Sequence, residues 1–300
     1  MEEFEASLKD FFSKLKESDF EEAKCIFCSN ENIIHLFKKD SMDVVRCKCG
    51  FIFNKTQPTS LTLDRFYKSE ALKVWGNIKK TDSRQEVKYK SAISHIKTCG
   101  YKTVLDIGCG TGYFIRELKK YGIYALGLNT DSSEKEPTLI VGDAASACIR
   151  NESYEDFFKH DERMFDVISL WGVLEHVKDP RSLIKGAKQK LKDFGTIIIC
   201  VPNCESTVVK TLWEKCFTFC PQHLWYFSFD SLERLLSQEN LDITHVEFIE
   251  YEIDPIVKNS LGLDPYIRQI PDWMIEKINE EKEKISETDI APYKITVFAK

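Results

Sequence analysis

From Tyr101 onward, short apolar runs alternate with amphipathic segments along the chain. KTVLDIG, YALGLN, TLIVGD, FDVISLWG and GTIIICVPN each predict a buried strand. GYFIRELKKYG between the first two predicts a helix closed by Gly122, since glycine suits the left-handed position after a helix. ITHVEFIEYEI and YKITVFAK near the end predict two more strands. Strands that alternate with helices indicate a mostly parallel sheet covered on both faces.

The first hundred residues have a different pattern. FEASLKDFFSKLKESDF, residues 4–20, spaces its aromatic and leucine residues as in an amphipathic helix. Its polar face is mixed in charge, so we expect it to pack on the protein and not on a membrane. Residues 56–97, with their mixed aromatics and charges, predict a helical connection. The predicted divisions are an N-terminal helix (1–24), a cysteine-containing module (25–55), a helical linker (56–98) and an α/β domain (99–300).

Composition excludes several classes of protein. The 300 residues are 43% hydrophobic and 30% charged with a net charge of −6, which disfavours nonspecific binding to nucleic acid or to an anionic membrane. No apolar run reaches the roughly 18–20 residues of a membrane span, and the acidic first residues do not resemble a secretory signal. We therefore expect a cytoplasmic, reducing location, where eleven cysteines suggest metal binding before disulfides.

Four of these cysteines have the spacing of a metal site. Cys25 and Cys28 are followed, after eighteen residues with β-like runs, by Cys47 and Cys49 and a glycine. Two such pairs on facing turns predict tetrahedral thiolate coordination of Zn²⁺, and four cysteines leave no open position, so the zinc would be structural. The second pair is C-x-C and not the commoner C-x-x-C. His35 is a spare ligand candidate, and four unrelated buried cysteines are the alternative.

The segment VLDIGCGTGYF contains the most informative turn. A buried strand ends at Asp106, and Gly108, Gly110 and Gly112 lead into a helix. Glycine permits positive φ and lets a ligand approach the backbone closely. The spacing is G-x-G-x-G, whereas the NAD-binding loop is G-x-G-x-x-G. The next strand ends at Asn129, 21 residues after the first glycine.

Over about residues 100–300, these motifs resemble the class I S-adenosylmethionine-dependent methyltransferases. VLDIGCGTG resembles their first motif, VGDA their acidic turn after the third strand, and FDVISLWGVLEHVKDP and LKDFGTIIICVPN their fourth- and fifth-strand motifs. The resemblance implies an α/β, Rossmann-like, seven-stranded, mostly parallel sheet and S-adenosylmethionine as cofactor. PQHLWYFSFDSLERLL is similar to a stretch of the branch that includes small-molecule and sugar methyltransferases. The order of a zinc-ribbon-like cysteine module, a helical linker and an α/β domain resembles the order in predicted methyltransferases of surface-polysaccharide or deoxysugar pathways.

The resemblance also implies roles for individual residues. The backbone of Gly108–Gly112 would lie against the methionine moiety, and Asp106 would help hold its ammonium or would only satisfy loop N–H groups. Asp143 and the N–H of Ala144 would bind the adenine edge, unless Asp143 is simply a turn residue. Trp171 at the end of the fourth strand would favour the sulfonium cation or wall the pocket.

Asn129 departs from the family pattern, in which a carboxylate at this position binds the ribose. An amide keeps about one of the two good hydrogen bonds, so we expect a loss of about 1–2 kcal/mol and not abolition of binding. Asp131 is a second candidate for this contact, and Asn129 as a simple turn residue is the alternative. By analogy, Tyr67, Trp75 and Arg84 fold over the cofactor, with ordinary helix packing as the alternative.

Methyl transfer to oxygen requires alignment of the reacting atoms and a base. The candidates are His176 in LEHV and His223 in PQHLWYF, with Tyr226 as a third, weaker option. Both histidines are expected near the carboxyl edge of the sheet, although either could have a purely structural role. Asp230 and Glu233 have the spacing of a structural capping box.

We therefore expect methyl transfer to a small hydroxylated acceptor, such as a saccharide or nucleotide-linked sugar. An RNA methyltransferase whose ribbon grips RNA is a second possibility, which the net charge of −6 and the lack of an N-P-P-[YFW] motif disfavour. A non-catalytic scaffold that kept the fold is the third possibility, in which Asn129 would mark the loss of the enzymatic function. The pattern indicates neither the oligomeric state nor the acceptor atom.

Overall fold

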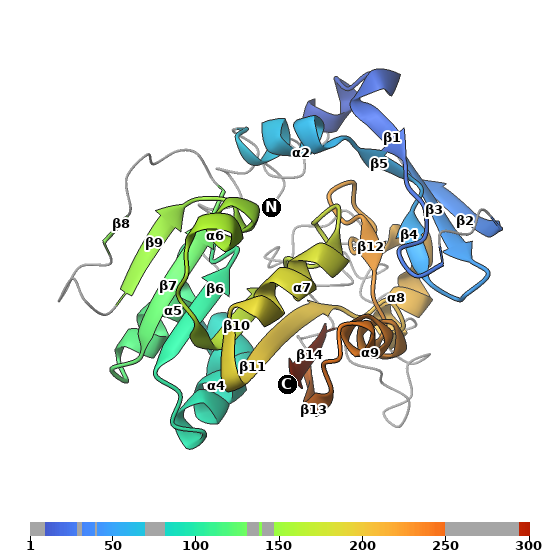
Figure 1. The fold of residues 1–300 in the computed structure, drawn as a ribbon. Coiled ribbons are helices and arrows are strands. Elements are labelled where there is room, and N and C mark those ends of the chain that lie inside the picture. Colours follow the sequence, from blue (N-terminus) through green and yellow to red (C-terminus); the bar gives the residue numbers. More distant parts are fainter. Residues whose placement is uncertain are drawn as a thin grey trace, which may run out of the picture.

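An eight-stranded sheet forms the centre of the protein (Figure 1), with the strand order β13-β14-β11-β10-β6-β7-β9-β8. The computed structural model describes residues 10–28, 32–39, 41–69, 82–130, 138–139, 147–249 and 294–300. The strands of this sheet are β6 (Thr103–Ile107), β7 (Tyr124–Asn129), β8 (Thr138–Leu139), β9 (Ala147–Asn151), β10 (Phe165–Trp171), β11 (Leu191–Pro202), β13 (Ile243–Ile249) and β14 (Lys294–Ala299).

The strand directions confirm the predicted seven-stranded, mostly parallel sheet. β9, β7, β6, β10 and β11 pair in parallel, and β14 lies antiparallel between β11 and β13. β8 adds a short antiparallel edge beside β9. The carboxyl ends of the parallel strands therefore meet at one edge, where this kind of sheet binds its ligands.

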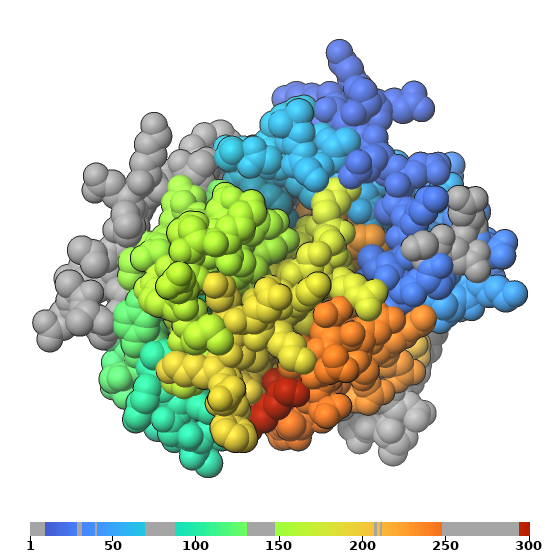
Figure 2. Space-filling view, in the orientation of Figure 1, coloured from blue at the N-terminus to red at the C-terminus, as the bar shows by residue number. Residues whose placement is uncertain are grey.

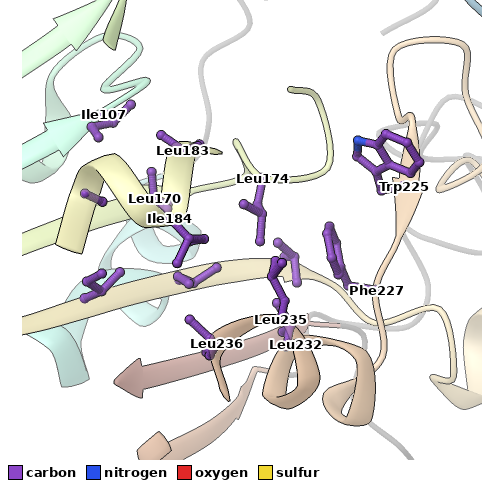
Figure 3. Packing of buried hydrophobic residues seen from close by; sticks show 14 of the residues in the cluster. Ile107, Leu170, Leu174, Leu183, Ile184, Trp225, Phe227, Leu232, Leu235 and Leu236 are labelled. Atoms are coloured by element: carbon purple, nitrogen blue, oxygen red, sulfur yellow. The ribbon is translucent and has the colours of Figure 1, made fainter. Parts of the chain in front are cut away.

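Two helical layers cover the sheet because successive strand residues point to opposite faces. Val104 belongs to the same buried cluster as residues of α4 (Asp82–Thr98) and α5 (Tyr113–Lys119). Its neighbour Leu105 belongs to the cluster that contains residues of α6 (Tyr154–His160), α7 (Pro180–Gln189) and α9 (Phe229–Gln238). Figure 3 shows part of the second layer, in which Ile184 and Leu235 lie over the sheet. This three-layer arrangement is the one that the alternating pattern predicts.

The third parallel strand lies later in the chain than predicted. The run TLIVGD was expected to pair beside β7, but Ala147–Asn151 occupies that position and Thr138–Leu139 pairs antiparallel at the edge. Strand β9 contains Arg150 and Asn151, so its sequence lacks the apolar run of a buried strand. The turn after the third parallel strand is therefore the one that follows Asn151.

The N-terminal residues build a second, four-stranded sheet in the order β12-β4-β3-β2. Strands β2 and β3 match the β-like runs expected between the cysteine pairs, and β4 follows the second pair. The fourth strand, β12, comes from far along the chain and pairs antiparallel with β4. The bounds are β2 (Ile33–Lys39), β3 (Met42–Cys47), β4 (Ile52–Asn54) and β12 (Trp225–Tyr226). The cysteine module therefore shares a sheet with the domain that follows it.

The helix expected for residues 4–20 does not extend to its predicted end. Residues 10–13 are helical, a 3-10 turn η1 follows at Glu17–Asp19, and β1 (Phe20–Glu22) pairs with β5 (Thr56–Pro58). Pairing with β5 requires extended backbone, which overrides the helical periodicity.

The linker supplies α2 (Ser60–Tyr67) before α4, and α8 (Thr207–Leu212) and η2 (Trp213–Lys215) precede β12. In Figure 2 the blue N-terminal module borders the orange α9, and Arg234 of α9 lies 4.6 Å over the Phe27 ring.

The predicted capping box at α9 is wrong in its residues. Ser228 is the N-cap residue, and its hydroxyl accepts from the N–H of Ser231, while the Ser231 side chain accepts from the N–H of Ser228. Asp230 lies within the first turn instead, where its negative charge suits the helix N-terminus. The observed capping box lies earlier in the chain than the predicted one because Ser228 and Ser231 satisfy the same capping pattern with shorter side chains.

Candidate active site

The glycine turn after β6 has left-handed backbone at all three glycines and no space for a side chain at the first of them. Gly108, Gly110 and Gly112 have φ values of +69°, +53° and +71°. A Cβ on Gly108 would lie 2.6 Å from Cγ2 of Val173. The N–H groups of Gly108 and Cys109 both donate to the Leu128 carbonyl, at 2.8 and 3.0 Å. The turn is thus anchored to the end of β7 and packs against the segment after β10.

Asp106, directly before this turn, is buried, and its Oδ1 accepts from the Ser169 hydroxyl at 2.7 Å. Burial raises the pKa of Asp106 to about 7, against the opposing effects of the Ser169 hydrogen bond and of the positive charge of Lys88. A carboxyl group in this state gains from a further cation, because a nearby positive charge favours its ionised form.

Trp171 ends β10 and forms an aromatic wall on the same side of the sheet as α4. Its ring lies edge-on to Tyr89 and Phe114, with centroid separations of 4.9 and 5.3 Å. The Lys88 ammonium lies 5.4 Å from the ring centroid. The indole N–H is buried and has no hydrogen-bond partner within the described parts of the chain, so a polar atom of a ligand would satisfy it.

At the end of β7, Asn129 is half-buried and pairs in register with Asn151 of β9. Its carbonyl accepts from the N–H of Glu152 at 3.0 Å. The Glu152 carboxylate, 2.9 Å from Nε2 of His160, is the acidic group that follows the third parallel strand. Sequence reasoning missed this residue because it assigned the third strand to an earlier run.

Some of the residues named in the sequence analysis lie outside the described residues. They are Asp131, Asp143, Ala144, Trp75 and the side chain of Arg84.

Glu175 and His176, from the segment after β10, meet His223, from the segment before β12. Nε2 of His176 lies 3.9 Å from Oε1 of Glu175, and the two imidazole rings are 4.7 Å apart at an angle of 74°. Burial lowers the pKa of both histidines to about 4. Burial also raises the pKa of Glu175. The structure thus brings together the two histidines that the sequence analysis named and adds a carboxyl group to them.

Tyr67 and Tyr226 lie in different places relative to this cluster. Burial raises the pKa of Tyr67, and the charge of Glu175 raises it further, so Tyr67 of α2 lies near the cluster. Tyr226 is buried, with its ring packed on Phe219 and its hydroxyl 3.8 Å from Sδ of Met42. Tyr226 therefore belongs to a separate apolar cluster beneath the N-terminal sheet.

The four cysteines of the N-terminal module converge. Sγ of Cys25 lies 3.5 Å from Sγ of Cys49, Sγ of Cys28 lies 3.3 Å from Sγ of Cys47, and all four atoms lie within 4.8 Å of one another. Tetrahedral zinc with Zn–S bonds of about 2.3 Å puts its sulfurs roughly 3.8 Å apart, so the spacing fits. His35 lies elsewhere, with its Nδ1 3.0 Å from Oδ1 of Asp43.

Backbone hydrogen bonds to sulfur also suit a metal-binding knuckle. The amides of Phe27 and Cys28 donate to Cys25, and those of Cys49 and Phe51 donate to Cys47 and Cys49 respectively. Such bonds stabilise thiolates, the form of cysteine that binds metals. All eleven cysteines of the chain are free of disulfides.

Hydrogen bonds connect this module to the Glu175 segment through Leu224. The carbonyl of Leu224 accepts from the backbone N–H of Asn54 at 3.0 Å and from Nε2 of Gln57 at 3.2 Å. The N–H of Leu224 in turn donates to the Glu175 carbonyl at 2.8 Å. Nε1 of Trp225 donates to the Val177 carbonyl at 2.7 Å. The strands next to the cysteines thus help to position His223 and Glu175.

Comparisons with known proteins agree with this arrangement. A family model described as "Methyltransferase domain" matches residues 64–246. The ubiquinone biosynthesis O-methyltransferase of Glaesserella parasuis serovar 5 (strain SH0165) is 28% identical over 174 residues, 53% of this chain and 72% of the relative. That of Actinobacillus pleuropneumoniae serotype 7 (strain AP76) is 32% identical over 118 residues, 37% and 47% of the two chains.

Among solved structures, the magnesium protoporphyrin IX methyltransferase of Synechocystis PCC 6803 with bound SAH has the same fold. It aligns with a TM-score of 0.53 over 80% of this chain and 99% of its own, at 10% identity. Among the helices that the structure describes, none has the length and apolar character to cross a bilayer.

Proposed function

We propose that this chain, which belongs to the methyltransferase-domain family, methylates a hydroxyl group of a small acceptor. It is an S-adenosylmethionine-dependent enzyme with the class I fold. The observation that carries this proposal is the contact between the two halves of the site. Val173 packs on Gly108 of the glycine turn, and Glu175 and His176 follow it within the same segment. A methyl donor in the turn and an acceptor at the histidines would therefore be neighbours.

On the cofactor side, Gly108, Gly110 and Gly112 would receive the methionine moiety and Asp106 its ammonium. Asn129 would bind the ribose, and Trp171 would lie beside the sulfonium, where its ring face favours a cation. The turn after β9, with Glu152, replaces Asp143 and Ala144 as the proposed adenine contact, because it follows the third parallel strand.

On the acceptor side, the hydroxyl would bind at Glu175, His176 and His223. His176 and His223 are the two candidate bases, since burial keeps both rings neutral at pH 7 and a neutral ring nitrogen accepts a proton. Tyr226 is left out of the site because its hydroxyl lies near Met42.

For the acceptor, we propose a saccharide or nucleotide-linked sugar, as the order of modules suggests. The relatives named as ubiquinone biosynthesis O-methyltransferases support oxygen as the acceptor atom and make a hydroxylated aromatic precursor the second candidate.

The four cysteines would hold one structural zinc ion, because their spacing and backbone hydrogen bonds fit a closed tetrahedral site. Thiols in this number, none of them in a disulfide, support a reducing, cytoplasmic location as part of the proposal.

Calorimetry with S-adenosylmethionine and S-adenosylhomocysteine tests the cofactor half. We expect micromolar binding by the wild-type chain and a loss of at least about tenfold for Asp106→Ala. A wild-type chain that binds neither compound at high micromolar concentration would be a scaffold and not an enzyme. Radiolabelled methyl transfer to a panel of nucleotide sugars and dihydroxylated aromatic acids then separates the two acceptor classes. Binding to RNA that falls steeply with salt would instead favour an RNA substrate.

A further inference from the structure

Glu175, His176 and His223 form a second group of metal-ligand side chains, separate from the cysteines. One ligand atom from each lies within 4.8 Å of the other two. Glu175 and His176 come from the segment after β10, and His223 comes from the segment before β12. A carboxylate with two imidazoles is a set that binds divalent transition metals, above all Zn²⁺.

The hydrogen bonds of the two histidines leave the correct nitrogen available. Nδ1 of His176 lies 3.0 Å from the Gln222 carbonyl, and Nδ1 of His223 lies 2.7 Å from the Thr218 carbonyl. A carbonyl only accepts, so each Nδ1 carries the proton and each Nε2 keeps a lone pair. Metal-binding histidines are usually oriented in this way, with the second ring nitrogen bonded to a carbonyl or carboxylate.

Glu175 is the group for which the protein provides too few partners. It is 3% exposed, and within the described residues nothing donates to its Oε2. A buried carboxylate oxygen without a hydrogen bond is unfavourable, and a bound cation would satisfy it directly.

We propose that Glu175, His176 and His223 bind one divalent transition-metal ion, with open coordination positions that take two adjacent oxygen atoms of the acceptor. Metal–ligand bonds of about 2.0–2.2 Å bring ligand atoms to roughly 3–3.5 Å, so binding would draw this group together by about 1 Å. The acceptor part rests on the proposed function and narrows it to vicinal diols, a feature that sugars and dihydroxylated aromatic rings share.

The location suits activation of a hydroxyl group. A Cβ on Gly172 would lie 3.5 Å from Oε1 of Glu175, and the next residue, Val173, packs on Gly108. A metal ion lowers the pKa of a bound hydroxyl, whose proton leaves to water. The resulting oxygen attacks the methyl carbon, the carbon–sulfur bond breaks, and its electron pair stays on sulfur as a neutral thioether. The ion would thus take over the task that a free imidazole base would have.

The test is a Co²⁺ titration of the full chain after its cysteine site has been filled with zinc. We expect one further equivalent of Co²⁺ to bind, with d–d absorption and without the thiolate charge-transfer band that cysteine ligands give. His176→Asn and His223→Asn keep a donor for the carbonyl but remove Nε2, so each should weaken Co²⁺ binding by at least about 100-fold. His245→Asn, at an exposed histidine of β13, is the matched control and should bind as the wild type does.

No additional Co²⁺ in the zinc-filled wild type, or equal binding in all variants, would overturn the metal site. Thermal unfolding checks that the variants are folded. S-adenosylhomocysteine binding is measured in parallel, and its absence in the wild type would remove the proposed function without affecting the Co²⁺ result. Finally, catechol or a monosaccharide should shift the Co²⁺ spectrum, and an unchanged spectrum with both would overturn the vicinal-diol acceptor.

Discussion

Gly108→Ala is the substitution whose effect the structure defines most closely. Gly108 has φ +69°, and an added Cβ would lie 2.6 Å from Cγ2 of Val173. The left-handed conformation costs a non-glycine residue about 1–2 kcal/mol, and overpacking adds about 1–3 kcal/mol. We therefore expect the free energy of unfolding to fall by about 2–5 kcal/mol. Gly110→Ala separates the two effects, because φ is +53° there and no atom lies within 4 Å of the added Cβ.

The assay is urea unfolding of both variants, of Val173→Ala and of the Gly108→Ala/Val173→Ala double variant. Gly110→Ala should lose only about 1–2 kcal/mol. In the double variant the clash is gone, so the two substitutions should be less than additive by about 1–3 kcal/mol. Equal losses for Gly108→Ala and Gly110→Ala, or strict additivity in the cycle, would refute the close packing of the glycine turn on the segment after β10.

Three further predictions concern other parts of the molecule. In the proposed site the Asp106 carboxylate binds the cofactor ammonium, and burial raises the pKa of Asp106 to about 7. Affinity for S-adenosylhomocysteine should therefore fall roughly tenfold per pH unit below that value. Calorimetry should show no such slope for Asp106→Asn, and a flat wild-type profile would contradict the prediction. Cys28→Ser should release zinc, measured by metal analysis, and reduce methyl transfer while S-adenosylhomocysteine still binds; loss of both together would argue against separate roles. Trp225→Phe leaves the Val177 carbonyl without its indole donor and should lower the free energy of unfolding by about 1–3 kcal/mol in urea, whereas an unchanged midpoint would show that this bond contributes nothing.

The parts of the fold that were predictable are those in which local pattern and tertiary environment agree. β6 and the glycine turn combine a largely apolar, buried strand with glycines that a tight turn needs, and both were predicted correctly. β9 was missed because Arg150 and Asn151 make it look like a loop, and only its pairing with β7 makes it a strand. β12 has two residues, Trp225 and Tyr226, and pairs with a strand far away in the chain, which no local periodicity encodes.

The candidate site shows the same division. Asp106 and the two histidines were found from their places after strands, since the carboxyl ends of parallel strands meet at one edge. Glu175 was overlooked, although it stands next to His176, because its burial and its missing hydrogen bond are properties of the folded chain.

The pairing of β4 with β12 also has a consequence for synthesis on the ribosome. Gln57 bonds to Leu224, 167 positions away in the chain, so the N-terminal sheet cannot be completed until most of the protein has been translated. Until then the β4 edge in the first sixty or so residues stays unpaired, and an unpaired edge favours association with other nascent chains. Early binding of zinc by the four cysteines would keep this N-terminal segment compact.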